Sequence, residues 1–278
     1  MKLLKFAFVA SLLFVMLGFT SLAQANGLVL KSITGCAVLG AQAVTNTGSS
    51  VISGGVCVSP GTAISGFPTP GTVNNGTIHD NDEVAILAQA NATFDFSALN
   101  ALATLPSTTS LTGQDLGGMT LTPGVYSFSS SAQLTGNLTL NFNNLNDVNI
   151  IIVTGSTLTT ASASSVTVEN AGTNDNVYWV VGSSAILGSS TSFVGNILAK
   201  ASITLGSTAS INCGSALALT GAVTLDDNQI NACSAAGVSG GSGGGGTSPT
   251  PEPGTLILLL TGGLAIAALF SRRLLAVS

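Results

Sequence analysis

The sequence predicts an all-β solenoid with one long α-helix packed alongside it. Apolar residues recur at a period near 20 in two series: Leu187, Leu205, Leu225, and Phe193, Ile211, Ile230. Each repeat is too short to bury its own apolar side, so neighbouring repeats must stack. Only 6% of the residues are charged while 34 are glycine, which suits short strands with tight turns. A single stretch, residues 81–105, has helical spacing instead.

The first β coil is expected in residues 28–58, where short apolar pairs alternate with Thr, Ser and Gly. Two turns then stop the strands, at Ser59-Pro60-Gly61 and at Phe67-Pro68-Thr69-Pro70-Gly71. These turns separate the first coil from the helical stretch.

The helix is expected over residues 81–105, with Asp80 and Glu83 as a capping box at its start. Its apolar residues recur at helical spacing: Val84, Leu87, Ala88, Phe94, Ala98, Leu102 and Leu105. Pro106 ends the pattern. Such a helix is about 37 Å long, while six or seven rungs stack to roughly 29–34 Å. One helix can therefore cover a whole side of the solenoid.

Strands resume after the helix, from Leu111-Thr112-Gly113 to residue 231. The continuous apolar run from Val148 to Val153 predicts a strand that is buried on both faces. The period-20 repeats then complete the stack, and the whole solenoid domain is expected to span residues 26–236.

The charge balance argues against nucleic acid as a partner. The chain has a formal net charge of −5. Between residues 26 and 250 there are two lysines, no arginine and ten acidic residues, a balance of two minus ten, or −8. A domain this acidic cannot neutralise phosphates.

Residues 1–25 resemble a secretory signal peptide. Lys2 and Lys5 form the basic start, an apolar run follows, and Ala23-Gln24-Ala25 is the expected cleavage site. The chain is therefore expected to be exported.

The C-terminal end carries a second targeting feature. Residues 237–250 form a Gly/Ser-rich linker, followed by Pro251-Glu252-Pro253, an apolar run to Phe270, and Arg272-Arg273. This order resembles the PEP-CTERM sorting signal of Gram-negative bacteria. The resemblance implies that residues 251–278 hold a transmembrane helix and are processed by an exosortase after export across the inner membrane. The protein would then be released or attached to the cell surface, in contact with the membrane only through that helix and only before processing. A plain C-terminal membrane anchor is the alternative.

Four cysteines lie outside the targeting segments: Cys36, Cys57, Cys213 and Cys233. An even number in an exported chain favours disulfides over metal ligation. Cys36 and Cys57 are 21 residues apart and Cys213 and Cys233 are 20 apart, about one solenoid turn. Residues stacked on adjacent rungs lie about 5 Å apart, within reach of a disulfide. These two pairings are expected, and crossed pairings remain open if the first coil stacks beside the last.

Several motifs together resemble the ice-binding-protein family of bacteria, fungi and algae. They are Thr45-Asn46-Thr47-Gly48, Val58-Ser59-Pro60-Gly61, Ile64-Ser65-Gly66-Phe67, Leu121-Thr122-Pro123-Gly124-Val125-Tyr126, Gly195-Asn196-Ile197-Leu198-Ala199 and Ser202-Ile203-Thr204-Leu205. Their order around the helix covers about residues 33–231. The resemblance implies a discontinuous right-handed β-solenoid of triangular section, in which the first coil stacks beside the last.

No set of residues predicts catalysis, a cofactor or a metal site. His79 is the single histidine, and no Gly-x-Ser-x-Gly motif supplies a nucleophile for it. A polysaccharide lyase or hydrolase is the main enzymatic alternative, but no pair of carboxylates forms a motif. Asp226-Asp227-Asn228 could contact Ca²⁺, although a solvated turn is the commoner role of such a sequence. A protein that is not an enzyme is expected.

What remains is surface, because alternate strand residues point outward. One outward face is expected to carry Thr157, Thr159, Ser184, Ser202, Thr204 and Thr224. The second carries the residues just before the apolar rung position, where the family resemblance implies a Thr-Gly/Ala-x-Thr/Asn pattern. On that face the predicted ice-binding residues are Thr47, Ser50, Ser162, Ser165, Ser189, Ser192, Ser207 and Ser210.

Two functions stay open at this point. The first, implied by the resemblance, is an exported ice-binding protein whose partner is the ice surface. The second is a structural or adhesive protein of the extracellular matrix, which the C-terminal signal favours equally.

Overall fold

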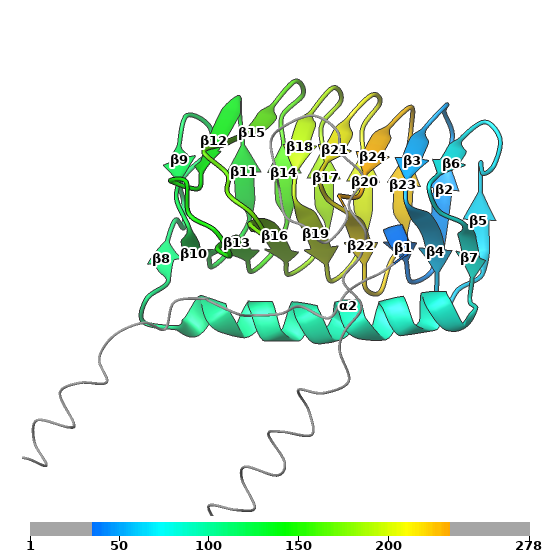
Figure 1. The fold of residues 1–278 in the computed structure, drawn as a ribbon, viewed down its shortest axis with the longest axis horizontal. Helices are drawn as coiled ribbons and strands as arrows, with labels where there is room; N and C mark the ends of the chain where they lie inside the picture. The colour runs from blue at the N-terminus through cyan, green and yellow to red at the C-terminus, as the bar shows by residue number, and fades with distance from the viewer. Residues whose placement is uncertain (1–34, 234–278) are drawn as a thin grey trace, which may run out of the picture. The chain divides into compact units, whose positions relative to one another are not determined.

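The computed structural model describes residues 35–233. The predicted signal peptide, the Gly/Ser-rich linker and the sorting segment with its transmembrane helix lie outside the described residues. Within 35–233 the chain winds through three parallel sheets, so that the cross-section is a triangle whose sides are the sheets (Figure 1). The predicted solenoid is confirmed.

Sheet A is the nine-stranded side, against which the helix packs. Its order is β7 (Ile78–Asp80), β4 (Gly55–Val58), β1 (Cys36–Gly40), β22 (Ala216–Ala218), β19 (Asn196–Ala199), β16 (Asn176–Val181), β13 (Asn149–Thr154), β10 (Gly124–Phe128) and β8 (Thr109–Ser110). All pairings within it are parallel.

Sheets B and C form the other two sides. Sheet B has the order β11 (Ala132–Leu134), β14 (Leu158–Thr160), β17 (Ala185–Leu187), β20 (Ile203–Leu205), β23 (Val223–Leu225), β2 (Ala43–Asn46) and β5 (Ala63–Ser65). Sheet C has the order β6 (Thr72–Asn74), β3 (Val51–Ser53), β24 (Gln229–Asn231), β21 (Ser210–Asn212), β18 (Ser192–Val194), β15 (Ser165–Glu169), β12 (Asn137–Asn141) and β9 (Thr120–Leu121).

The stack is discontinuous in sequence, as the family resemblance implied. Strand β1 pairs with β22 through Val38 and Ala216, and β2 pairs with β23 in the same way. The first coil therefore continues the last one. The helical stretch runs along the stack and joins the coil at one end to the coil at the other end (Figure 1).

The core lies between the three sheets and is filled by the inward column of each strand. Phe193, Ile211 and Ile230 are aligned on neighbouring strands and are almost fully buried, as the period predicts. Trp179 of sheet A lies 4.7 Å from Phe193, centroid to centroid, and its indole nitrogen donates to the carbonyl of Val194. An aromatic pair with a satisfied polar group joins two sides of the triangle.

Sheet A is buried on both faces, which explains the continuous apolar run that the sequence shows at β13. Ile150 and Ile152 point into the solenoid core, whereas Ile151 belongs to a second cluster under the helix. That second cluster joins Leu39, Val180, Leu198 and Leu217 of sheet A to Ala85, Ala88, Ala92 and Leu99 of the helix.

The long helix is α2 (Glu83–Ala101), followed by a 3₁₀ turn, η1 (Leu102–Thr104). Its N-cap is Asp82, whose Oδ1 accepts from the backbone amide of Ala85 at 3.0 Å. The predicted capping residue, Asp80, is instead the last residue of β7. That prediction was wrong because two aspartates precede Glu83 and the strand extends to the first of them.

The buried side of α2 also differs from the predicted one. The residues in contact with sheet A are mostly alanines, while Val84, Leu87 and Phe94 are 38%, 59% and 55% exposed. Small side chains let the helix axis approach the sheet closely, which large ones at those positions would prevent.

Both predicted disulfides are present, Cys36–Cys57 and Cys213–Cys233. The first links the adjacent strands β1 and β4 of sheet A. The second fastens the end of the last coil to the coil before it. Within residues 35–233, no helix has the length and apolar character needed to cross a membrane.

Candidate functional site

Sheets B and C are the two sides that α2 does not cover, and each presents outward rows of side chains in strict register. On sheet B, each strand contributes one residue to a row that points outward. Strand pairing aligns these residues as Gln133, Thr159, Ile186, Thr204, Thr224, Thr45 and Ser65. We call the five residues Thr159, Ile186, Thr204, Thr224 and Thr45 the threonine row.

The threonine row is built from residues whose neighbours in the strand are buried. In β20, Ile203 and Leu205 are at most 1% exposed, while Thr204 between them is exposed. Threonine is β-branched and its side chain is therefore stiff about χ1. Strands repeat at about 4.8 Å, so the row places one hydroxyl and one methyl at each regular step, with Ile186 as the single break.

The hydroxyl groups of the threonine row are available to an external partner. Among residues 35–233, no hydrogen bond joins the side chain of Thr45, Thr159, Thr204 or Thr224 to another protein group. Beside the row, by contrast, the Thr157 hydroxyl donates to Ser131 at 2.8 Å. The free hydroxyls would otherwise bond only to water.

The predicted serines lie on sheet C and at the corner between sheets B and C. Ser165, Ser192 and Ser210 are paired on adjacent strands and point outward. The row continues with Gln229 and Val51, which replace the hydroxyl with an amide and an apolar group. It is therefore three serines long, and Ser165 already donates to Asn137 at 2.9 Å.

Ser162, Ser189 and Ser207 occupy the turns that connect sheet B to sheet C. They lie next to the serine row but not in it, so the eight predicted residues do not form one surface. The left-handed conformation of the next residue in each turn, with φ of 58° at Ala163 and Ser190, fixes the corner.

The predicted position of Ser50 on the outward face is wrong. Its side chain is fully buried, donates to Asn46 Oδ1 at 2.7 Å and accepts from the amide of Asn228 at 2.8 Å. Strand β3 pairs through Ile52 with Ile230, so Ile52 is the inward residue and Val51 the outward one. The prediction placed Ser50 just before the inward residue of its coil, which shifted this coil by one residue.

Thr47 is displaced by the same shift. It follows Asn46, which pairs with Leu225, and its hydroxyl lies 3.2 Å from Asp226 Oδ1 and 3.3 Å from the carbonyl of Leu225. Its hydroxyl is therefore used within the corner, unlike those of Ser189 and Ser207.

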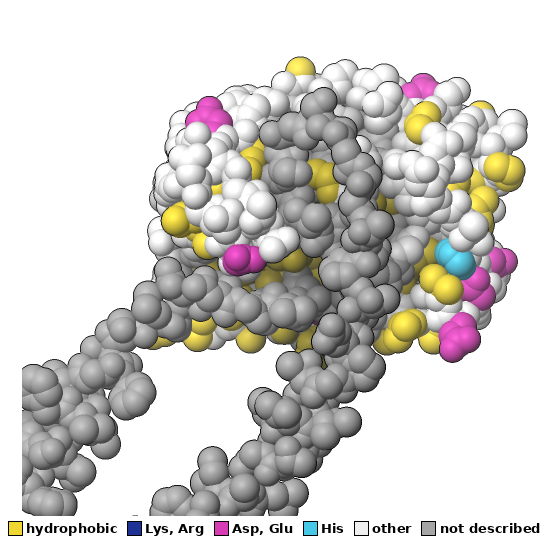
Figure 2. Space-filling model, in the orientation of Figure 1, with side chains coloured by type: hydrophobic (Ala, Val, Ile, Leu, Met, Phe, Trp, Pro, Cys, Tyr) yellow, Lys and Arg dark blue, Asp and Glu magenta, His cyan; other side chains and the backbone are white. Residues whose placement is uncertain are grey.

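Neither outward row contains a charged residue. Lys200 is the one lysine or arginine between residues 35 and 233. Glu169 and Asp226 stand at a strand end and in a turn, and Asp115 pairs with Gln133 beyond the end of the threonine row. The face that is visible in Figure 2 is mainly uncharged and polar, with acidic side chains in small separate groups. Such a surface suits a neutral partner that is recognised by hydrogen bonding and shape.

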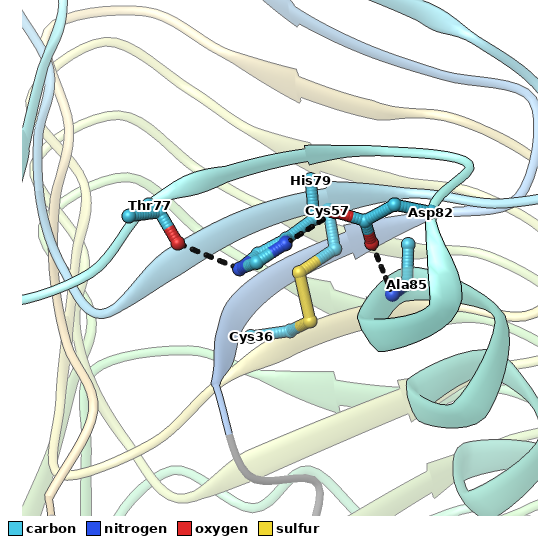
Figure 3. The surroundings of a disulfide bond; sticks show 6 residues. All are labelled: Cys36, Cys57, Thr77, His79, Asp82 and Ala85. Carbon is cyan, nitrogen blue, oxygen red and sulfur yellow. Dashed lines mark hydrogen bonds and ion pairs between the residues drawn. A yellow bond between two sulfur atoms is a disulfide. The ribbon is translucent and has the colours of Figure 1, made fainter.

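The single histidine belongs to a hydrogen-bonded chain at the start of α2 (Figure 3). Thr77 Oγ1 lies 2.7 Å from His79 Nε2, and His79 Nδ1 lies 2.7 Å from Asp82 Oδ2. The other oxygen of Asp82 caps the helix at Ala85. The hydrogen bond from Ala85 and the contact with His79 lower the pKa of Asp82. The chain fixes the N-terminus of α2 above the Cys36–Cys57 disulfide (Figure 3).

The family described as ice-binding-like matches residues 38–231, which is nearly all of the solenoid. The chain belongs to the ice-binding-like family. An ice-binding protein of Nostoc sp. (strain HG1) is 49% identical over 249 residues, covering 88% of this chain and 86% of the relative. An ice-binding protein of Flavobacterium frigoris (strain PS1) is 31% identical over 204 residues, covering 70% of this chain and 72% of the relative.

Solved structures of ice-binding proteins have the same fold. One from an Antarctic biological consortium superposes with a TM-score of 0.70 at 36% identity, over 76% of this chain and 93% of that chain. One from Antarctomyces psychrotrophicus gives 0.68 at 36% identity, over 75% and 99%.

Sequence reasoning put Thr159, Thr204 and Thr224 on one outward face and Ser165, Ser192 and Ser210 on the other, but it misplaced Ser50 and could not rank the two rows. Both consist of small hydroxyl residues at alternate positions. They differ mainly in length, because Gln229 and Val51 interrupt the serine row, and within residues 35–233 Ser165 alone of its three serines has a side-chain hydrogen-bond partner, Asn137; both features depend on strand register.

Proposed function

We propose that this protein binds ice through the threonine row of sheet B. The support from similarity is the Nostoc relative, an ice-binding protein that matches 88% of this chain at 49% identity. The support from geometry is one observation: four threonines stand in register over five adjacent strands with hydroxyls that no described protein group uses.

An extended row is what recognition of ice requires. A single hydroxyl gains little at an ice surface, because liquid water offers it equally good hydrogen bonds. Many hydroxyls held at fixed spacing can match a crystal together, and their methyl groups leave the water as they do so. Threonine loses less side-chain freedom than serine when it is held in one rotamer, because β-branching has already restricted it.

The serine row of sheet C, with Ser165, Ser192 and Ser210, is the second candidate face. It is shorter and serine lacks the methyl group, so we rank it below the threonine row. Ser162, Ser189 and Ser207 would extend it around the corner, and Ser50 is excluded because it is buried.

We further propose that the protein has no catalytic activity and acts outside the cell. Two disulfides fit an oxidising compartment. Export across the inner membrane of a Gram-negative bacterium, exosortase processing at Pro251-Glu252-Pro253 and release or surface attachment rest on the sequence patterns at the two ends.

A structural or adhesive role in the extracellular matrix is the alternative function, favoured by the same C-terminal pattern. The deciding experiment uses the purified chain from Asn26 to Thr250. Ice binding requires that it slows ice recrystallisation and lowers the freezing point below the melting point. Inactivity in both assays, in protein with intact disulfides, would favour the structural or adhesive role over ice binding.

A further inference from the structure

One apolar surface of the solenoid is not explained by the fold or by ice binding. It is the flank of α2 formed by Val84, Leu87, Phe94 and Ala98, which recur at helical spacing. We call it the flank stripe. Val84, Leu87 and Phe94 are 38%, 59% and 55% exposed. Figure 2 shows hydrophobic side chains along the side of the molecule where Figure 1 places α2.

The rest of α2 does not account for the flank stripe. The sheet side of the helix is filled by alanines and Leu99, so the stripe is a second apolar surface on the same helix. A helix with two apolar sides usually packs against something on each. An exposed apolar surface of this kind marks a place where another segment or molecule binds.

The chain itself enters the structure beside this stripe. Gly35 is the first described residue, and a side chain placed on it would lie 3.5 Å from Cγ1 of Val84. The residues that follow form β1, whose Cys36 and Leu39 pack against α2. The segment before Gly35 therefore begins at the end of the flank stripe nearest the helix N-terminus.

The segment between the expected cleavage site and Gly35 matches the stripe in length and character. It is residues 26–34, and its apolar residues are Leu28, Val29, Leu30 and Ile33. Nine extended residues reach about 30 Å, and the 19 residues of α2 span about 28 Å.

We propose that residues 26–34 bind in extended form along the flank stripe of α2. The occupant is this segment and not a second copy of the protein. A stable dimer interface buries about 1,200–2,000 Å², more than a few side chains on one helix supply. A tethered segment needs no such area because its effective concentration is high.

The test compares the chain that starts at Asn26 with one that starts at Gly35. Removal of the segment should increase the fluorescence of an apolar dye severalfold and accelerate amide exchange in α2. Leu30→Glu in the longer chain should have the same effect without any truncation, and Asn100→Glu, on an exposed position away from the stripe, should not. Unchanged dye binding and exchange in both altered chains would refute the proposal. So would a dimer, seen by sedimentation, that Leu87→Glu dissociates.

Discussion

The inward and outward assignment of strand β20 gives the sharpest prediction about stability. Leu205 is 1% exposed and contributes to the solenoid core, whereas Thr204, the residue before it, points outward from sheet B. Leu205→Ala removes a buried side chain and leaves a cavity, which costs about 2–5 kcal/mol in proteins generally. Thr204→Ala removes an exposed side chain and should change the free energy of unfolding by less than about 0.5 kcal/mol.

These values translate into clearly separated melting temperatures. A domain of this size shifts by about 2–4 °C for each kcal/mol, so Leu205→Ala should melt about 4–20 °C lower than the unmodified protein. Circular dichroism in the strand region, recorded during heating and checked by urea titration, measures both variants. A loss of stability in Thr204→Ala equal to that in Leu205→Ala would refute the register on which the two faces are defined.

Three further predictions concern the disulfides and the titrating groups. The double substitution Cys213→Ala with Cys233→Ala opens a loop with a sequence separation of 20 and should lower the free energy of unfolding in urea by about 3 kcal/mol; no change would mean that the last coil does not need the link. Asp82 has a pKa below its ordinary value of 3.8 because it accepts a hydrogen bond from Ala85 and contacts His79. Its contribution to the stability of the folded protein is therefore present above pH 3.8 and is lost as the pH falls through the lower pKa of the folded state. Acid-induced loss of helical circular dichroism should consequently weaken in Asp82→Ala, and an unchanged acid profile would remove Asp82 as the cap. Burial and then the charge of Asp95 raise the pKa of Tyr178 to about 12. Ultraviolet titration of a Tyr126→Phe protein should therefore show ionisation near pH 12, and the free energy of unfolding should fall as the pH rises from 10 through that value. Ionisation at pH 10 would contradict the packing under α2.

The sequence predicted the solenoid because its period is carried by large residues that cannot be exchanged with polar ones. Phe193, Ile211 and Ile230 mark one inward column unambiguously. In the first coil the inward residue could not be identified from the sequence, because Val51 and Ile52 are both apolar and either could point inward. Pairing with Ile230 decides between them, and pairing is a property of the stack, not of one coil.

The helix illustrates a different limit. Its position was predictable from spacing and from Pro106, but α2 is shorter than the expected 81–105, and the side in contact with sheet A was not predictable. Alanines such as Ala88 and Ala92 carry little hydrophobic signal, although they are what permits close packing on a sheet. The larger residues Leu87 and Phe94 carry the signal and lie on the flank stripe instead.

The two outward rows show why the candidate site could be located but not chosen. Alternation predicts that Thr204 and Ser192 both point outward, and the structure confirms it. Alternation does not reveal that Ser165 is already bonded to Asn137 or that Gln229 and Val51 interrupt the serine row. Those facts come from neighbours about 20–180 residues away in sequence.

The most direct test of ice binding by the threonine row is the thermal hysteresis of two tyrosine variants, Thr204→Tyr and Ser192→Tyr. Both positions are the outward residue of a short strand in the middle of a sheet, so each variant should fold and melt like the unmodified protein. A tyrosine at Thr204 would hold ice away from Thr224 and Ile186, its neighbours in the row. The proposed mechanism predicts that Thr204→Tyr loses most of the hysteresis while Ser192→Tyr keeps it. Full activity in Thr204→Tyr together with loss in Ser192→Tyr would contradict it and place the ice-binding surface on sheet C.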